Sequence, residues 1–136
     1  MSVLNKKWFI IPQKDKKIGL PQNPILMLLA ATAIYSMIIP TAIIDLSTVI
    51  YQEIYFGIMN IPKIKRSEYL VFDRQKLAQL TAMQKLGCVY CSYVNGILAW
   101  CKAVANQTET YSCAIKHLAT KEGQEHQQDF YEFNEI

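Results

Sequence analysis

The stretch ILMLLAATAIYSMIIPTAII, from Ile25 to Ile44, decides the fold of this chain, because its 20 residues carry no charge. As an α-helix it would be about 30 Å long, which matches the hydrocarbon thickness of a bilayer. The alternative is the core helix of a soluble protein. A chain of 136 residues has little else with which to surround a helix that is apolar on every side. We therefore expect a helix embedded in a membrane.

Pro40 lies inside this run and leaves two topologies open, because proline kinks or breaks a helix. In the first, the helix crosses the membrane as a single span. Lysines before it favour a cytoplasmic N-terminus, which would place the cysteines outside, where thiols oxidise. In the second, the chain bends at Pro40 and returns as a re-entrant segment to the cytoplasmic face. That side keeps thiols reduced, and we favour it.

Charge and composition divide the chain into three parts. Residues 1–23 form a basic N-terminal segment, residues 24–60 a membrane-associated helical segment, and residues 61–136 a helical domain that contains all the cysteines. Positive charge is not arranged as a stripe along a folded element, so we expect no nucleic-acid partner. The basic segment suits anionic lipid headgroups, and the expected partners are membrane lipid and either other proteins of a membrane complex or further copies of this chain.

The residues after Ile44 continue the helix with an apolar face that now includes polar side chains. Asp45 and Gln52 are seven residues apart and share one face, and Glu53 lies at its edge. This polar face either turns to water or carries carboxylates near membrane depth that serve protons or a metal. Ile61-Pro62 should stop the helix.

Basic residues follow at once, at positions 63, 65 and 66, and suit a headgroup surface. Further on, apolar residues at spacings of three and four predict a helix from Asp73 to Asn106, with Asp73 as its N-cap. A turn at 106–110 and a second helix from about Thr110 to Phe130 would complete an antiparallel helical hairpin. The predicted fold class is mainly α: a membrane-embedded helix, single-span or re-entrant, followed by this hairpin.

Soft metal ligands are concentrated in the predicted hairpin. Cys88 and Cys91 would share one helical face, Cys113 and His117 would share a face of the second helix, and the two pairs would meet. Three thiolates and one imidazole suit tetrahedral zinc, and also iron, mononuclear or in an iron–sulfur cluster. The c-type haem motif is excluded because Ser92, not histidine, follows Cys91. Core packing or thiol redox chemistry are the alternatives for these cysteines.

Three functions are compatible with these patterns. The first is a membrane-attached metal protein with a structural or electron-transfer role in a membrane assembly, without catalysis of its own. The second is a thiol–disulfide oxidoreductase that uses Cys88-x2-Cys91. The third is a small metal-dependent membrane enzyme in which Asp45, Glu53 or Asp73 assists the metal. No catalytic residue is identified by a motif.

The motifs also carry a resemblance, which runs from about Pro40 to His117. It is carried by Ile61-Pro62, Arg66-Ser-Glu-Tyr69, Asp73-Arg74, Cys88-Val-Tyr-Cys91-Ser-Tyr-Val-Asn-Gly96 and Thr108-Glu-Thr-Tyr-Ser-Cys113-Ala-Ile-Lys-His117. In these residues the chain resembles a family of small, uncharacterised bacterial membrane-associated proteins. The resemblance implies location at the bacterial inner (cytoplasmic) membrane and implies no activity.

The chain departs from that family pattern next to its third patterned cysteine. The pattern has a tryptophan before this cysteine and a proline after it, where this chain has Ser112 and Ala114. Cys101 does not belong to the pattern, and we therefore leave it out of the expected ligand set. As a small buried hydrophobe it would instead pack in the core.

Overall fold

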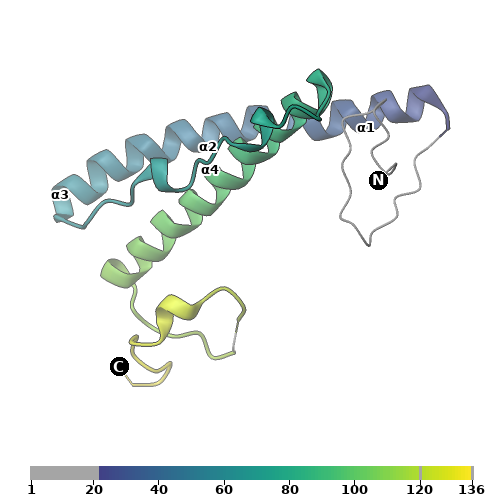
Figure 1. Ribbon diagram of the computed structural model, residues 1–136. Helices are drawn as coiled ribbons and strands as arrows, with labels where there is room; N and C mark the ends of the chain where they lie inside the picture. Colours follow the sequence, from purple (N-terminus) through teal and green to yellow (C-terminus); the bar gives the residue numbers. More distant parts are fainter. Residues whose placement is uncertain (1–21, 120, 136) are drawn as a thin grey trace.

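The computed structural model describes residues 22–119 and 121–135, and a single long helix dominates it. Four consecutive pieces form that helix: α1 (Pro24–Ser36), α2 (Ile38–Tyr51), η1 (Gln52–Phe56) and α3 (Gly57–Met59). Figure 1 shows them end to end. The whole helix contains 36 residues, which corresponds to about 54 Å. The predicted long apolar helix is present and extends well beyond the uncharged run.

The chain does not bend back at Pro40, so the re-entrant hairpin is absent from the structure. Pro40 is the third residue of α2, where a missing N–H costs little because the first turn of a helix has no partner for it. A single residue in a turn conformation, Met37, joins α1 to α2. Its N–H donates to Ile34 O, three residues earlier, at 3.4 Å. The irregularity next to Pro40 is confined to one residue, and α2 continues along the axis of α1.

The helix ends where the sequence predicts, just before Ile61-Pro62. Its last turns widen at η1, a π-helical turn, and Asn60 then adopts a left-handed conformation with φ 54°. Asparagine tolerates this region better than most residues, and here it reverses the chain. The N–H of Ile61 closes the end by donating to Phe56 O at 3.0 Å.

The second long helix, α4, spans Ala82–Ser112, so both of its predicted ends were wrong. It begins at a capping box in which the Thr81 side chain accepts from the Gln84 N–H and the Gln84 side chain accepts from Thr81. Asp73 instead precedes a short 3-10 turn, η3 (Arg74–Lys76), and its side chain caps nothing.

The predicted turn at 106–110 is also absent, because nothing in this stretch breaks a helix. It contains no glycine or proline, and the hydroxyls of Thr108 and Thr110 donate back to carbonyls four residues earlier, Val104 O and Asn106 O. The helix therefore runs on as far as Ser112. The second helix of the predicted hairpin does not form.

Residues 113–119 and 121–135 instead form irregular segments beneath the end of α4 (Figure 1). A single bridge pairs Ile115 with Tyr131, and one short 3-10 turn, η4 (Glu125–Gln127), lies between them. The Gln127 side chain donates to Glu109 on α4 and thereby attaches the second segment to the helix. Figure 1 shows it as the yellow part near the C-terminus.

The two long helices run in the same direction along their contact. Three side-chain contacts show this, because both residue numbers rise together: Thr48 with Cys101, Tyr51 with Thr108 and Tyr55 with Ser112. Parallel neighbours need a connection that returns to the starting end. Residues 60–81, which we call the crossover, make that return and contain η2 (Arg66–Glu68) and η3.

The core forms where the crossover covers the junction of the two helices. It consists of Phe56, Ile61, Ile97, Trp100 and Val104, all fully or nearly buried. The Trp100 indole N–H donates to a crossover carbonyl, Ile64 O, at 3.0 Å, so the largest core side chain keeps its polar atom paired.

Among the described residues, two helices are long and apolar enough to cross a membrane: Pro24–Met59 and α4. They differ in how much of that apolar surface the protein itself covers. The most apolar window of Pro24–Met59 is 11% buried, against 33% for α4. The first helix therefore presents the larger uncovered apolar surface.

Candidate functional site

The predicted metal ligands lie in two separate places. Cys88 and Cys91 are half-buried free thiols one turn apart near the start of α4. Cys113 is the exposed residue just past the other end of α4, and His117 lies beyond it, also exposed. Cys88 and Cys113 are about seven helical turns apart, roughly 37 Å along the axis.

The Cys3His centre therefore does not form within one chain in this conformation. Thiolate and imidazole ligands must lie within about 2.0–2.3 Å of zinc, and the straight course of α4 separates the two pairs far beyond that. Throughout the described part of the chain, no group of three or more histidine, cysteine, aspartate or glutamate side chains is placed to hold a metal ion.

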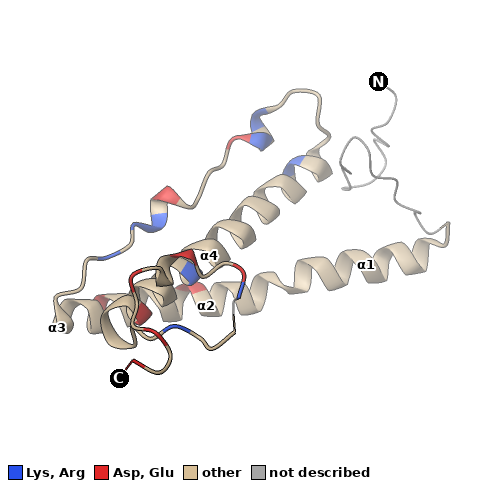
Figure 2. Ribbon diagram, turned by 90° about the horizontal axis from the view of Figure 1, so that it is seen from below, with Lys and Arg blue, Asp and Glu red and all other residues tan. Residues whose placement is uncertain are grey.

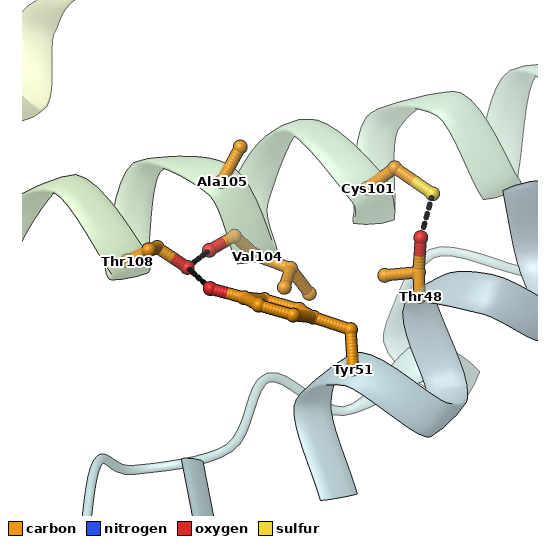
Figure 3. A pocket seen from close by; sticks show the side chains of 6 residues that line it. All are labelled: Thr48, Tyr51, Cys101, Val104, Ala105 and Thr108. Atoms are coloured by element: carbon orange, nitrogen blue, oxygen red, sulfur yellow. Dashed lines mark hydrogen bonds between the residues drawn. The ribbon is translucent and has the colours of Figure 1, made fainter. Parts of the chain in front are cut away.

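Cys101 packs against the core and also contacts α2. Its sulfur lies 3.3 Å from the Thr48 hydroxyl, and it lines a pocket of about 290 Å³ between the two helices. Figure 3 shows this pocket, in which Tyr51 bridges to the Thr108 hydroxyl at 2.8 Å. The pocket is lined mostly by small and apolar groups, and its hydroxyls are paired across it, Tyr51 with Thr108 and Thr48 with the sulfur of Cys101. It therefore fastens α2 to α4.

The most organised polar cluster surrounds Asp45. Its carboxylate accepts two bonds from the Arg66 guanidinium, at 2.8 and 2.5 Å, and a third from the Tyr93 hydroxyl at 2.8 Å. The three residues come from α2, the crossover and α4. This cluster therefore ties all three segments together at one point.

The electrostatics of Asp45 follow from this geometry. Hydrogen bonds from Arg66 lower the pKa of the Asp45 carboxyl below its ordinary value, and burial opposes that shift without cancelling it. The bond from Tyr93 lowers it further. Asp45 is thus ionised and neutralised by a bidentate arginine, an arrangement of high geometric specificity.

Gln52 makes the second polar attachment of the crossover. Its side-chain carbonyl accepts from the Ile64 N–H at 2.9 Å, and its amide donates to Ile64 O at 3.2 Å. One buried side chain thereby satisfies both backbone groups of an extended residue, as a neighbouring strand would. The shared face of Asp45 and Gln52 was predicted, and it holds the crossover instead of facing water.

The basic residues after Pro62 were expected at headgroups, but two of the three are paired within the chain. Arg66 binds Asp45, and Lys63 lies 2.6 Å from Glu53 in an exposed ion pair. Lys65 is the exposed basic residue that remains between them. Further along the crossover, Arg74 donates to the Ser92 hydroxyl at 2.9 Å.

Sequence reasoning missed these pairings, although one signal pointed to them. A carboxylate that follows 20 uncharged residues needs a partner, and Arg66 was a nearby cation. The sequence does not indicate which of the nearby basic residues returns to Asp45. That choice depends on the parallel path of the two helices.

Chemically, this arrangement is suited to holding segments together. Asp45 and Glu53 each pair with a cation, and Asp73 stands alone on the exposed crossover. Four free thiols remain among the described residues, and of these Cys88 and Cys91 are the two that lie one helical turn apart. No family model, curated protein or solved structure matches this chain, so the resemblance to bacterial membrane-associated proteins rests on its motifs alone.

Proposed function

We propose that this protein is a membrane-attached protein with a structural role in a membrane assembly, held on lipid by the Pro24–Met59 helix. The observation that carries the proposal is the uncovered apolar surface of this helix. Large aliphatic side chains stay exposed along its whole length, including Ile25, Leu29, Ile43 and Ile54. Exposed apolar patches of this extent mark sites of membrane or protein contact.

The placement of charge supports the same proposal. Within Pro24–Met59 the charged residues are Asp45 and Glu53, and both pair with cations of the crossover. In Figure 2, α1 carries no charged residue, whereas lysine and arginine follow the crossover. The outward surface of the helix can therefore enter lipid without desolvating a charge.

A flotation experiment tests the attachment. The full chain should float with lipid vesicles in a density gradient, and the double variant Leu29→Glu with Ile43→Glu should remain at the bottom. A matched control is Leu118→Glu, which places the same charge on an exposed aliphatic residue of the C-terminal segment. It should float like the native chain. A native chain that stays monomeric in solution without detergent or lipid would contradict the proposal.

A second candidate function is thiol chemistry at Cys88 and Cys91. The observation that favours it is their spacing of one helical turn, which brings Cα atoms to roughly 5 Å, inside the range for a disulfide. A partner disulfide would accept the two electrons and two protons of the Cys88 and Cys91 thiols, leaving a new disulfide here and two thiols on the partner. Mass spectrometry after incubation with oxidised glutathione tests this. The candidate requires a loss of two mass units that is absent from Cys88→Ser.

Zinc or iron at the same pair would require a second chain. Cys88 and Cys91 supply two thiolates, and Cys113 and His117 of the same chain are too distant to complete the set. This hypothesis predicts metal bound only by the dimer: one ion where the two Cys88–Cys91 pairs meet, or two ions where each pair meets Cys113 and His117 of the other chain. The metal should be lost in Cys91→Ser. Elemental analysis of the dimer and monomer fractions measures both quantities, and metal bound by the monomer would contradict the hypothesis.

A further inference from the structure

The length of the apolar surface is the starting point. Exposed aliphatic residues occur on several sides of the long helix, and one row of them, opposite Asp45, has spacings that keep its members on a shared face from α1 to η1. The row consists of Ile25, Leu29, Ile39, Ile43, Ile50 and Ile54. From the first to the last they extend over about 44 Å of helix, whereas a hydrocarbon core is about 30 Å thick. The surface is longer than an upright span would use.

The position of the crossover adds a free-energy cost to an upright span. Arg74 of the crossover donates a hydrogen bond to Ser92 of α4. Ser92 lies between two tyrosines of α4 that contact the long helix. The Tyr90 hydroxyl donates to Ile34 O, and the Tyr93 hydroxyl donates to Asp45. Along the helix axis, Arg74 is therefore level with the uncharged run. If that run crossed the membrane upright, the crossover beside it would be at membrane depth too.

That part of the crossover is both charged and irregular. Between the Arg66 anchor and α4 it contains exposed Glu68, Asp73, Arg74 and Lys76. Charged side chains at membrane depth are costly, and extended backbone cannot be left facing lipid because its polar groups need partners. An upright arrangement would impose both costs on one segment.

One orientation avoids both costs. If the helix lies parallel to the membrane plane, the aliphatic row opposite Asp45 enters the lipid along its whole length, and the side of α2 that binds the crossover faces water. Asp45 lies on that opposite side, where Arg66 of the crossover covers it, and Glu53 lies at the edge of that side in an exposed ion pair with Lys63. Over α2 and η1, helix and crossover together then have the one-sided polarity of an interfacial amphipathic helix, with the cations supplied by a second segment, whereas α1 is uncharged on every side.

We infer that the Pro24–Met59 helix lies along the surface of a bilayer, immersed in a single leaflet by its aliphatic side, so that both its ends and the crossover are on the same side of the membrane. This inference rests on the membrane attachment proposed above and specifies its geometry. The occupant of the apolar surface is lipid, not a second copy, because the surface is uncharged along its length and its charged counterpart already belongs to the same chain.

Depth measurement by spin labels tests the geometry. Single cysteines at Leu29→Cys, Ile43→Cys and Ile54→Cys would be labelled in a background with the native cysteines changed to serine, and the chain bound to vesicles. All three labels should lie at a similar shallow depth of about 5–10 Å below the headgroup boundary. Lys65→Cys, on the crossover, is the matched control and should be accessible to a water-soluble relaxation agent.

The outcomes separate the two proposals. A chain that does not float with vesicles overturns the membrane attachment and this inference with it. A chain that floats but shows one label near the bilayer centre and the others near opposite surfaces overturns only the inference.

A second measurement uses the native chain and needs no substitution. A membrane-impermeant amine reagent is applied to one side of sealed vesicles, and labelled lysines are identified by mass spectrometry. Lys14, Lys16 and Lys17, which precede the helix, should be labelled together with Lys65 or not at all. Labelling of one group without the other would show that the helix crosses the bilayer.

Discussion

At the scale of single residues, Asp45 has the strongest consequences, because its carboxylate receives three hydrogen bonds from two other segments. Asp45→Asn should lower the free energy of unfolding by about 1–3 kcal/mol, the usual worth of hydrogen bonds to a charged group. Chemical denaturation of the lipid- or detergent-bound chain measures this loss.

The matched control for that variant is Glu53→Gln, which removes a carboxylate from the same helix. Its ion pair with Lys63 is exposed, with side-chain exposures of 44% and 60%, and such pairs contribute about 0–1 kcal/mol. Equal losses in the two variants would show that the Asp45 cluster does not hold the crossover.

The pKa of Asp45 predicts how this contribution depends on pH. Its folded pKa lies below the ordinary value of 3.8, so the unfolded chain binds the proton more readily. The stability due to Asp45 should be fully present above pH 3.8 and should disappear as the pH falls through the lower, folded pKa. Unfolding curves of the native chain and Asp45→Asn should therefore converge only in strong acid. Convergence near neutral pH would contradict the ionised pair.

At the scale of elements, Gly96 decides how closely the crossover approaches α4. A Cβ at Gly96 would overlap the backbone oxygen of Tyr69 and come within 2.8 Å of a Leu70 methyl carbon. Gly96→Ala should destabilise the chain by about 1–3 kcal/mol, because the backbone must move to admit the methyl group. Thermal unfolding followed by circular dichroism measures the effect.

The long helix contains the matched control, Gly57. A Cβ there meets nothing within 4 Å, so Gly57→Ala should stabilise the helix by about 0.5–1 kcal/mol. Opposite signs in the two variants would show that the crossover packs on α4 as described. Two stabilising variants would mean that the crossover does not lie against Gly96.

At the scale of the whole molecule, the straight course of α4 predicts which cysteines can be joined. In a variant that keeps only Cys88 and Cys113, a bismaleimide of short reach should give no link within one chain, because roughly 37 Å of helix separates them. Any linked product should be a dimer on a denaturing gel. A linked monomer would restore the helical hairpin and the single-chain metal centre.

A large part of the fold could be predicted from sequence. The uncharged run predicts a long apolar helix, Ile61-Pro62 predicts its end, and the spacing of Asp45 and Gln52 predicts that they share a face. That face was expected to turn to water or to serve protons or a metal, and it packs against the crossover instead. Local rules were sufficient for the helix, its end and the shared face, because a helix bonds only to itself and its faces repeat every few residues. The start of α4 was also readable, from the Thr81 and Gln84 capping box, but Asp73 was chosen in its place.

The arrangement of these elements was decided only by tertiary structure. The hairpin was predicted from a turn at 106–110 that never forms, because that stretch has helix-compatible residues and a partner for Thr108 on α2. Without the turn, Cys113 and His117 are carried far from Cys88 and Cys91, and the charged crossover returns beside the apolar helix. Composition determined that this protein has a long apolar helix and a concentration of thiols. Contacts between residues about 20 to 57 positions apart determined which segments pack on the helix and where the thiols lie. No local sequence pattern encodes such contacts.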